Sequence, residues 1–522
     1  MGTKNYDSAT DMITFSRASK GTALRKVSYG NELVTNGTFD TDTSGWVADS
    51  AATLSFSSGT AELVTTATGY LLPATPLTTA IGSVYTLTFS LTGASSTGHA
   101  RAGTTSLGVD LLNAGWGLVD GLHTFSFTAT STTTYIALGN GGVATMYVDN
   151  VSVKEVTFDQ ADGTLELFNH PDDIPRIEYD AAGAVKGLLI EEARTNLLPN
   201  SSVLNFINFR TATSTSTAVS PSGLQDAVLV QPTVASGITW VYDLTVYNTG
   251  VVTTISTFAK ASGKSFVTMP NSNGNVSYAS FNLTTGAVGT VASGYTANIE
   301  DFGNGWYRCS VTTPTGFNDR AVYAVSDTDG GVAAAANGND GILLYGVQLE
   351  AGGFASSYIP TSGASASRAA DIASIPTSAF GYNSGAGTVV VEAQRFGTNT
   401  YPRSVMIDSG YETDSIGLGA WGLLTSLSSL IKAGNVTQAS MYTGNVGTSA
   451  FKNSLAYKEN DFAASRDGGA VLTDTSGVVP TGLTTLRIGR NALKEQFFNG
   501  HIKSIQYYPR RLSNAQLQEL TT

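Results

Sequence analysis

Short runs of the sequence alternate apolar and hydroxyl residues, and this two-residue period limits the possible folds more than any other feature. In 85–91 the apolar residues occupy every second position, and Thr or Ser lies between them. The same alternation occurs in 124–128, 146–153 and 501–508. A period of two predicts strands with one buried face. The Gly, Asn and Ser turn signals between the runs are spaced as in β-sandwiches or barrels.

Helical periodicity is clear only near the C-terminus. There Ser513 is a suitable N-cap, and Leu517 and Leu520 share one face of a helical turn. We therefore expect an all-β protein with one short C-terminal helix.

Length, charge and cysteine content exclude several classes of protein. A chain of 522 residues is long enough for three or four domains. Its 28 basic and 40 acidic residues give a net charge of −12, and no dense basic run argues for nucleic acid. The only cysteine, Cys309, allows no intramolecular disulfide. Residues 1–21 lack signal-peptide features, and 415–431 is too rich in Gly and Ser to span a bilayer, so we expect neither Sec export nor membrane insertion.

A weak internal repeat divides the middle of the chain. One segment opens at 31–39 and closes at 146–155, and a second opens at 195–202 and closes at 344–350. Each segment is long enough for about eight strands whose first and last members could pair, as in a jelly-roll sandwich. We expect tandem jelly rolls, followed by a third β domain.

Several short motifs occur in order along the chain. They are Ile13-Thr-Phe-Ser-Arg-Ala-Ser, Pro175-Arg-Ile-Glu-Tyr-Asp, Lys186-Gly-Leu-Leu-Ile-Glu-Glu-Ala-Arg-Thr-Asn, Gly305-Trp-Tyr-Arg, Tyr345-Gly-Val-Gln-Leu-Glu and Ser357-Tyr-Ile-Pro-Thr. Together they resemble tailed-bacteriophage virion proteins of the head-spike and tail-fibre type. Asn460-Asp-Phe-Ala-Ala-Ser, Leu486-Arg-Ile-Gly-Arg and Asn499-Gly-His-Ile-Lys-Ser resemble concanavalin-like, laminin-G-like domains.

This resemblance implies an order of modules. In such proteins the first two motifs lie close together, whereas here about 150 residues separate them, so the first jelly roll resembles an insertion. The expected order is an N-terminal strand or attachment segment that pairs with 157–197 (1–30), an inserted carbohydrate-binding-like jelly roll (31–156), a connector (157–197), a second jelly roll (198–362), a linker (363–378) and a concanavalin-like domain (379–522).

The resemblance also implies a role. It predicts a structural protein on the virion surface, assembled in the bacterial cytoplasm, that contacts capsid or tail proteins and binds host-surface polysaccharide. The resemblance implies a homotrimer. This expectation comes from the family alone, because no heptad repeat in the sequence requires three chains.

The opening of the first jelly roll, Asn36-Gly-Thr-Phe-Asp, resembles carbohydrate-binding jelly rolls in which a structural Ca²⁺ joins the first and last strands. The matching ligands here are the Gly37 carbonyl, Asp40 and Asp149. Ca²⁺ prefers six to eight hard oxygen ligands, which carbonyls and carboxylates supply. The alternative is that Asp149 starts a turn or pairs with a surface base.

Tryptophans that stack on sugar rings are the natural candidates for glycan contacts. Trp116, Trp240 and Trp421 lie beside Gly or polar residues and are expected to be exposed. Trp46 and Trp306 are expected in the core. The alternative for Trp116, Trp240 and Trp421 is that they too are core residues.

We find no catalytic motif. The four histidines have no metal-binding spacing, and the paired acids Asp172–Asp173 and Glu191–Glu192 are expected to be solvated or in salt bridges. The leading hypothesis is therefore a non-catalytic fibre or spike. The alternatives are a tail-borne glycan depolymerase and a capsid decoration protein without a ligand.

Overall fold

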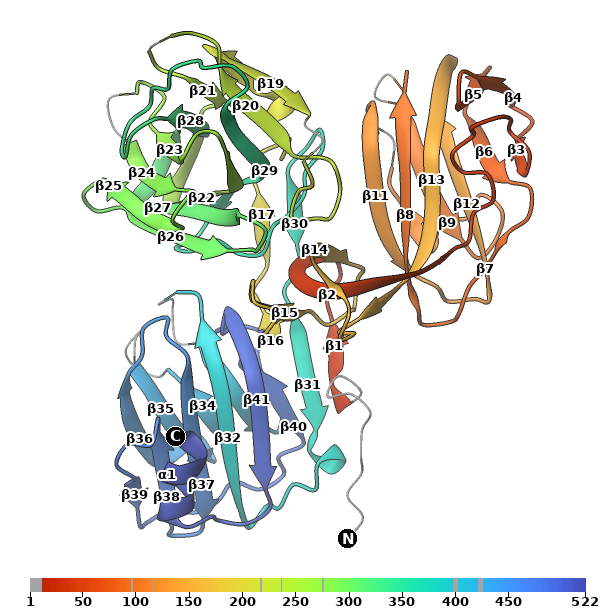
Figure 1. Ribbon diagram of the computed structural model, residues 1–522. Coiled ribbons are helices and arrows are strands. Elements are labelled where there is room, and N and C mark those ends of the chain that lie inside the picture. The colour runs from red at the N-terminus through yellow and green to blue at the C-terminus, as the bar shows by residue number, and fades with distance from the viewer. Residues whose placement is uncertain are drawn as a thin grey trace.

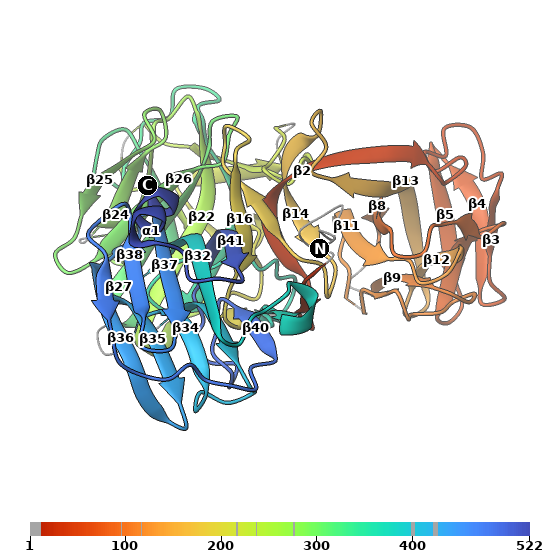
Figure 2. The same cartoon turned by 90° about the horizontal axis from the view of Figure 1, so that it is seen from below.

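The computed structural model describes residues 12–94, 97–115, 117–215, 218–235, 237–274, 277–397, 402–420 and 426–522. Within them, three β-sandwiches surround a smaller central part (Figure 1). We name the sandwiches by chain order: first (28–158), second (198–356) and third (372–522). We name the central part the hub, which comprises 12–27, 159–197 and 357–371. Figure 2 shows the first sandwich extending away from the other two.

The first sandwich encloses the core that the alternating runs predict. In 85–91, the apolar Tyr85, Leu87, Phe89 and Leu91 are at most 2% exposed. One sheet has the order β11 (Gly121–Thr128), β8 (Val84–Thr92), β13 (Ala144–Phe158), β2 (Gly21–Glu32) and β14 (Thr164–His170), with β5 (Thr60–Thr65) and β4 (Ala52–Ser57) added beside β13. The other has β10 (Leu112–Asn113), β9 (Gly98–Gly103), β12 (Thr133–Asn140), β6 (Gly69–Pro73) and β3 (Trp46–Ala48), with β7 (Leu77–Thr78) beside β12.

The second sandwich repeats this construction. One sheet has the order β18 (Ile207–Phe209), β21 (Trp240–Tyr242), β28 (Val322–Ser326), β23 (Phe266–Pro270), β24 (Ser277–Asn282) and β25 (Ala287–Val291). The other has β19 (Thr211–Thr215), β20 (Val228–Pro232), β29 (Gly341–Ala351), β22 (Tyr247–Ser262), β27 (Trp306–Asp319) and β26 (Thr296–Asp301). A 3₁₀ turn, η2 (Val203–Asn205), precedes β18.

The opening and closing segments of both jelly-roll repeats lie side by side, as expected. The Val151 amide donates to the Gly37 carbonyl at 2.8 Å in the first sandwich, and the Leu197 amide donates to the Leu349 carbonyl at 2.8 Å in the second.

The third sandwich includes strands from distant parts of the chain. One sheet has the order β1 (Thr14–Ser16), β31 (Ile372–Pro376), β40 (Thr485–Ile488), β33 (Arg403–Asp408), β34 (Ser415–Gly419), β35 (Ser426–Ala433) and β36 (Val436–Asn445). The other has β15 (Ile177–Tyr179), β16 (Val185–Ile190), β41 (Gly500–Tyr508), β32 (Ala386–Arg395), β37 (Phe451–Lys458), β38 (Phe462–Arg466) and β39 (Leu472–Asp474). Leu188 and Ile190 of β16 pack in its core, so the hub and the third sandwich share a hydrophobic interior.

The hub joins the three sandwiches through paired strands. β2 is long enough to pair with β14 over its first half and with β13 over its second half. β17 (Arg194–Asn196) pairs with β30 (Ala366–Arg368). The range 363–378, which we expected to be a linker, therefore contains β30, β31 and the start of a 3₁₀ turn, η3 (Thr377–Ala379).

The C-terminal helix α1 (Asn514–Thr521) has the predicted cap. Ser513 and Gln516 form a capping box, and Leu517 is fully buried. The expected all-β class with tandem sandwiches and a short C-terminal helix is confirmed. Across the described ranges, no helix has the length and apolar character needed to cross a membrane.

Candidate functional site: a cleft between two sandwiches

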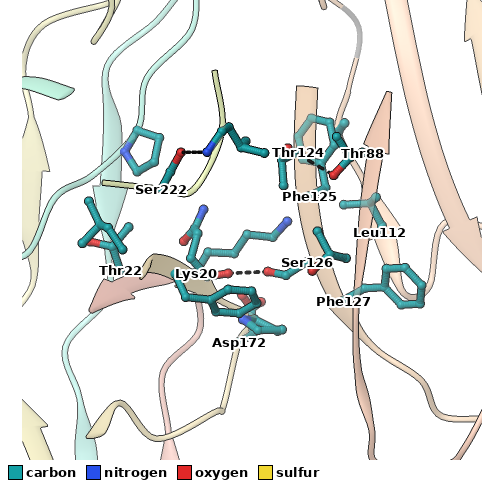
Figure 3. Close-up of a pocket in the computed structure, with 18 of the residues that line it drawn as sticks. Lys20, Thr22, Thr88, Leu112, Thr124, Phe125, Ser126, Phe127, Asp172 and Ser222 are labelled. Atoms are coloured by element: carbon teal, nitrogen blue, oxygen red, sulfur yellow. Dashed lines mark hydrogen bonds between the residues drawn. The ribbon is translucent and has the colours of Figure 1, made fainter. Parts of the chain in front are cut away.

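The main candidate site is a cleft of about 1100 Å³ between the first sandwich, the hub and the second sandwich. Strands β8, β11 and β13 form one wall, and residues from 222–226 together with Tyr345 form the opposite wall. Residues 19–22 and 171–173 of the hub lie between them. Figure 3 shows Lys20 between Ser222 on one side and Phe125 and Ser126 on the other.

The first-sandwich wall presents two rows of polar side chains. In the strand register, Ser152, Thr88 and Thr124 are direct cross-strand neighbours, and so are Lys154, Thr86 and Ser126. We call these two rows the hydroxyl ladder. Side chains alternate between the two faces of a strand, so these residues point outward because the apolar residues between them point into the core. The alternation that builds the core therefore also builds this wall.

Some polar atoms at this wall have hydrogen-bond partners in the protein and others do not. The Thr88 and Thr124 hydroxyls are 3.3 Å apart, and the Ser126 hydroxyl donates to the Asn169 carbonyl. Within the described residues, however, the buried Thr86 Oγ1, Thr128 Oγ1 and Asn169 Oδ1 have no hydrogen-bond partner. Buried polar groups are normally paired, so these atoms are where water or a ligand would be most useful.

Lys20 brings a cation into the cleft from the hub. Its Nζ lies 5.3 Å from the centroid of the Phe125 ring. Burial lowers the pKa of the Lys20 ammonium to about 8, although the nearby Asp172 carboxylate opposes this shift. Lys20 therefore loses its proton at a lower pH than a solvated lysine does.

Two carboxyl groups in the cleft contact the same turn, 220–224. Asp226 accepts a hydrogen bond from the Ser222 hydroxyl at 3.5 Å, and a side chain at Gly223 would collide with the Glu166 carboxyl group. The Tyr29 hydroxyl donates to Glu166 at 2.6 Å. Burial raises the pKa of the Glu166 carboxyl and raises that of Asp226 to about 6. Both acids hold their protons more strongly than a solvated carboxyl group.

Partly exposed aromatic rings line both sides of the cleft. Phe125 belongs to the first sandwich, and Tyr345 belongs to the second, 5.6 Å from the ring of Tyr358. Our sequence reasoning missed both, because it considered only tryptophan as a sugar-stacking residue. The position of Phe125 between Thr124 and Ser126 was visible in the sequence, but the wall that faces it was not.

None of the three predicted tryptophans is among the described residues that line this cleft. Trp240 is only 7% exposed and packs in a small cluster with Val322 and Ala324, 5.8 Å from the Phe209 ring. The expectation that it is exposed is wrong, because β21 lies between β18 and β28 and the Gly274 turn covers the indole. Trp116 and Trp421 lie outside the described residues.

The three proposed calcium ligands each have a local protein partner. The Gly37 carbonyl accepts from Val151, Asp40 accepts from the Thr38 hydroxyl at 2.8 Å, and Asp149 accepts from the Asn150 amide at 2.7 Å. The searched part of the chain, which omits the undescribed gaps, holds no group of three or more His, Cys, Asp or Glu residues suited to a metal. The calcium site stays a prediction.

Buried charges in the hub hold the cleft walls in place. Glu191, one of the paired acids, is fully buried between Arg176 at 2.9 Å and Arg368 at 3.4 Å. Burial opposes its ionisation, but these two guanidinium groups and hydrogen bonds from Ser357 lower the pKa of the Glu191 carboxyl to about 2. Glu191 is thus a structural ion-pair residue, as expected.

Comparison with known proteins gives no family for this chain. No family model matches it, and no curated protein matches it. Among solved structures, the CBM40 domain of Ruminococcus gnavus IT-sialidase is 16% identical, covers 27% of this chain and 84% of its own, and has a TM-score of 0.24.

Two tandem-domain structures overlap more of the chain. The mouse laminin α1 domains LG4–5 are 11% identical and cover 65% of this chain and 94% of their own, with a TM-score of 0.20. The CBM22-1–CBM22-2 tandem of Paenibacillus barcinonensis Xyn10C is 10% identical and covers 65% and 100%, with a TM-score of 0.18. At such low scores, these matches carry no inference about function.

Proposed function

We propose that this chain is a structural, glycan-binding fibre or spike protein on the surface of a tailed-phage virion, and that it holds glycans without cleaving them. The observation that carries the glycan part is the cleft, where the hydroxyl ladder faces Tyr345 across the hub. A sugar presents hydroxyls around its edge and C–H groups on its faces. Ser and Thr can donate to and accept from the hydroxyls, and aromatic rings can cover the faces.

The virion part rests on the ordered motifs and on where they lie. Arg17, Arg176 and Glu191 come from three of these motifs, and all are fully buried in the hub. The motifs thus supply the charged groups that fasten the sandwiches to one another. Such a joint suits a protein that must keep several binding domains in a constant arrangement while attached to a particle.

Avidity would make weak sugar sites useful. Several copies on one particle, for example in a homotrimer, raise the effective affinity by about 10²- to 10⁴-fold when their geometry allows simultaneous contact. Capsid or tail proteins would anchor these copies, and host-surface polysaccharide would be the ligand.

A glycan array probed with the purified chain tests the binding function. The double variant Thr88→Val/Thr124→Val keeps the shape of the ladder and removes two hydroxyls, so its affinity should fall about ten-fold. Thr473→Val, exposed in the third sandwich, is the matched control and should bind like the parent chain. Binding that is equal in all three proteins would remove the cleft as the glycan site. Immunogold electron microscopy of particles tests the virion position.

One observation favours a second candidate, a glycan depolymerase: Glu166 and Asp226 contact one turn in the cleft, and both have raised pKa values. This candidate predicts release of reducing ends from a bound polysaccharide and loss of that release in Asp226→Asn. The binding-only proposal predicts retention of the polysaccharide with no new reducing ends.

A further inference from the structure

We infer that the cleft selects uncharged glycans and discriminates against anionic ones. This inference rests on the proposed function, because it names the class of ligand for the same site. It concerns bacterial surface polysaccharides built from neutral sugars, as opposed to chains rich in uronic or sialic acid.

The first support is the balance of charge around the cleft. Among its described lining residues, five are acidic and two are basic. The acids lie on every wall: Asp110 on the first sandwich, Glu166, Asp172 and Asp173 on the hub, and Asp226 on the second sandwich. An anionic sugar would therefore meet like charges from whichever side it entered.

The second support is that both cations have acidic neighbours. Lys20 interacts electrostatically with the Asp172 carboxylate, which favours the charged form of the amine. Lys154 lies directly opposite Glu32 in the register of β13 and β2. Neither amine is therefore placed as an uncompensated positive charge that would attract a carboxylate ligand.

The third support is the chemistry of the unpaired groups. Thr86 is 7% exposed and its hydroxyl has no hydrogen-bond partner within the described residues, as is true of the Thr128 hydroxyl and the Asn169 side-chain carbonyl. The carbonyl can only accept, and hydroxyls can both donate and accept. A sugar hydroxyl complements both types of group, whereas a carboxylate cannot donate to the carbonyl.

Direct binding measurements test this selectivity. The probes are fluorescent oligomers of glucose, galactose, mannose and N-acetylglucosamine, together with oligogalacturonate and oligosialic acid. We expect at least one neutral oligomer to bind about ten-fold more tightly than either acidic one at low salt. The difference should shrink at about 0.5 M salt, because salt screens the repulsion. Tighter binding of an acidic oligomer would overturn the inference while leaving glycan binding intact. Absence of binding to all six would overturn the proposed glycan function as well.

Charge reversal at one exposed position provides a second test. Asp172 is exposed and lines the cleft, so Asp172→Lys should raise the affinity for oligogalacturonate about five-fold or more relative to the affinity for the best neutral oligomer. Glu459→Lys, exposed in the third sandwich, makes the same charge change away from the cleft and should alter neither. An equal effect of both variants, or none from Asp172→Lys, contradicts the inference. Circular dichroism checks that both variants fold.

Discussion

Arg176 and Asp371 form an ion pair of 2.5 Å although they lie 195 positions apart in the chain. Both side chains are fully buried. Arg176 also binds Glu191, and Arg17 reaches Asp371 at 3.3 Å. Through Arg17 and Arg176, Asp371 therefore connects the last segment of the hub, directly before the third sandwich, to the two earlier hub segments.

Removing one member of this network should be costly. Arg176→Met leaves Glu191 and Asp371 buried with Arg17 and Arg368 as their remaining cationic partners, and it should lower the free energy of unfolding by about 3–5 kcal/mol. Denaturant unfolding followed by intrinsic fluorescence measures the loss. Lys503→Ala breaks an exposed pair with Glu392, so it should cost less than about 1 kcal/mol. Similar costs for the two variants would contradict a structural role for the hub network.

The Glu178–His501 contact predicts an acid-sensitive joint between the hub and the third sandwich. The Glu178 carboxylate lies 2.6 Å from His501 and 3.4 Å from Lys186. Burial opposes ionisation, but these two partners hold the pKa of Glu178 well below its ordinary value near 4.5. The folded state then binds fewer protons than the unfolded state, so this stabilisation is complete above pH 4.5 and is lost as the pH falls below it.

Glu178→Gln isolates that contribution. The variant should be about 2 kcal/mol less stable at pH 7, and its free energy of unfolding should fall less steeply between pH 5 and pH 2 than that of the parent chain. Parallel curves for the two proteins across this range would show that Glu178 is not the group responsible.

The pH dependence of stability that Asp226 contributes should have the opposite sign to that of Glu178. Burial raises the pKa of its carboxyl to about 6 from an ordinary value of 3.8, so the folded state binds this proton more strongly. Its contribution to stability is highest below pH 3.8 and is lost as the pH rises to about 6. Asp226→Asn should therefore be about 1–3 kcal/mol more stable than the parent chain at pH 7 and nearly equal to it at pH 3.5. Thermal unfolding at the two pH values measures this, and destabilisation at pH 7 would contradict it.

The sequence predicts the local parts of this structure well, because they depend on neighbouring residues. Alternation in 85–91 identifies the buried face of β8, and the Ser513 cap identifies the start of α1. By contrast, the burial of Trp240 depends on Phe209 and the Gly274 turn, which are distant in the chain. The polar neighbours of Trp240 therefore gave a misleading indication of exposure.

The cleft could be predicted only in part for the same reason. The pattern of β8 and β11 shows which hydroxyls face outward, but it does not show what lies opposite them. That depends on the hub, which brings Tyr345 to the wall facing Phe125 across more than 200 positions of sequence. The excess of acidic residues is evident from the sequence, but only the fold shows that five of them line one cleft.

The charge of Lys20 should lower the free energy of unfolding and strengthen the binding of glycan. Burial lowers the pKa of its ammonium from 10.5 to about 8, so the folded state releases this proton more readily than the unfolded state. The charge costs stability below pH 8, and that cost fades as the pH rises from 8 to 10.5. Lys20→Met keeps an apolar chain against Phe125 and removes the charge. We expect it to be about 1–3 kcal/mol more stable at pH 7, with a smaller gain at pH 10.

The same variant should bind its glycan more weakly, because the ammonium is a hydrogen-bond donor placed between the two walls of the cleft. Denaturant unfolding and isothermal titration with the best array ligand measure the two effects on one protein. A gain in stability with a loss of affinity would indicate that the buried charge serves binding, since sites that bind are commonly less stable than the fold would allow. If affinity were unchanged, Lys20 would be a structural residue, and the ligand would contact the hydroxyl ladder without it.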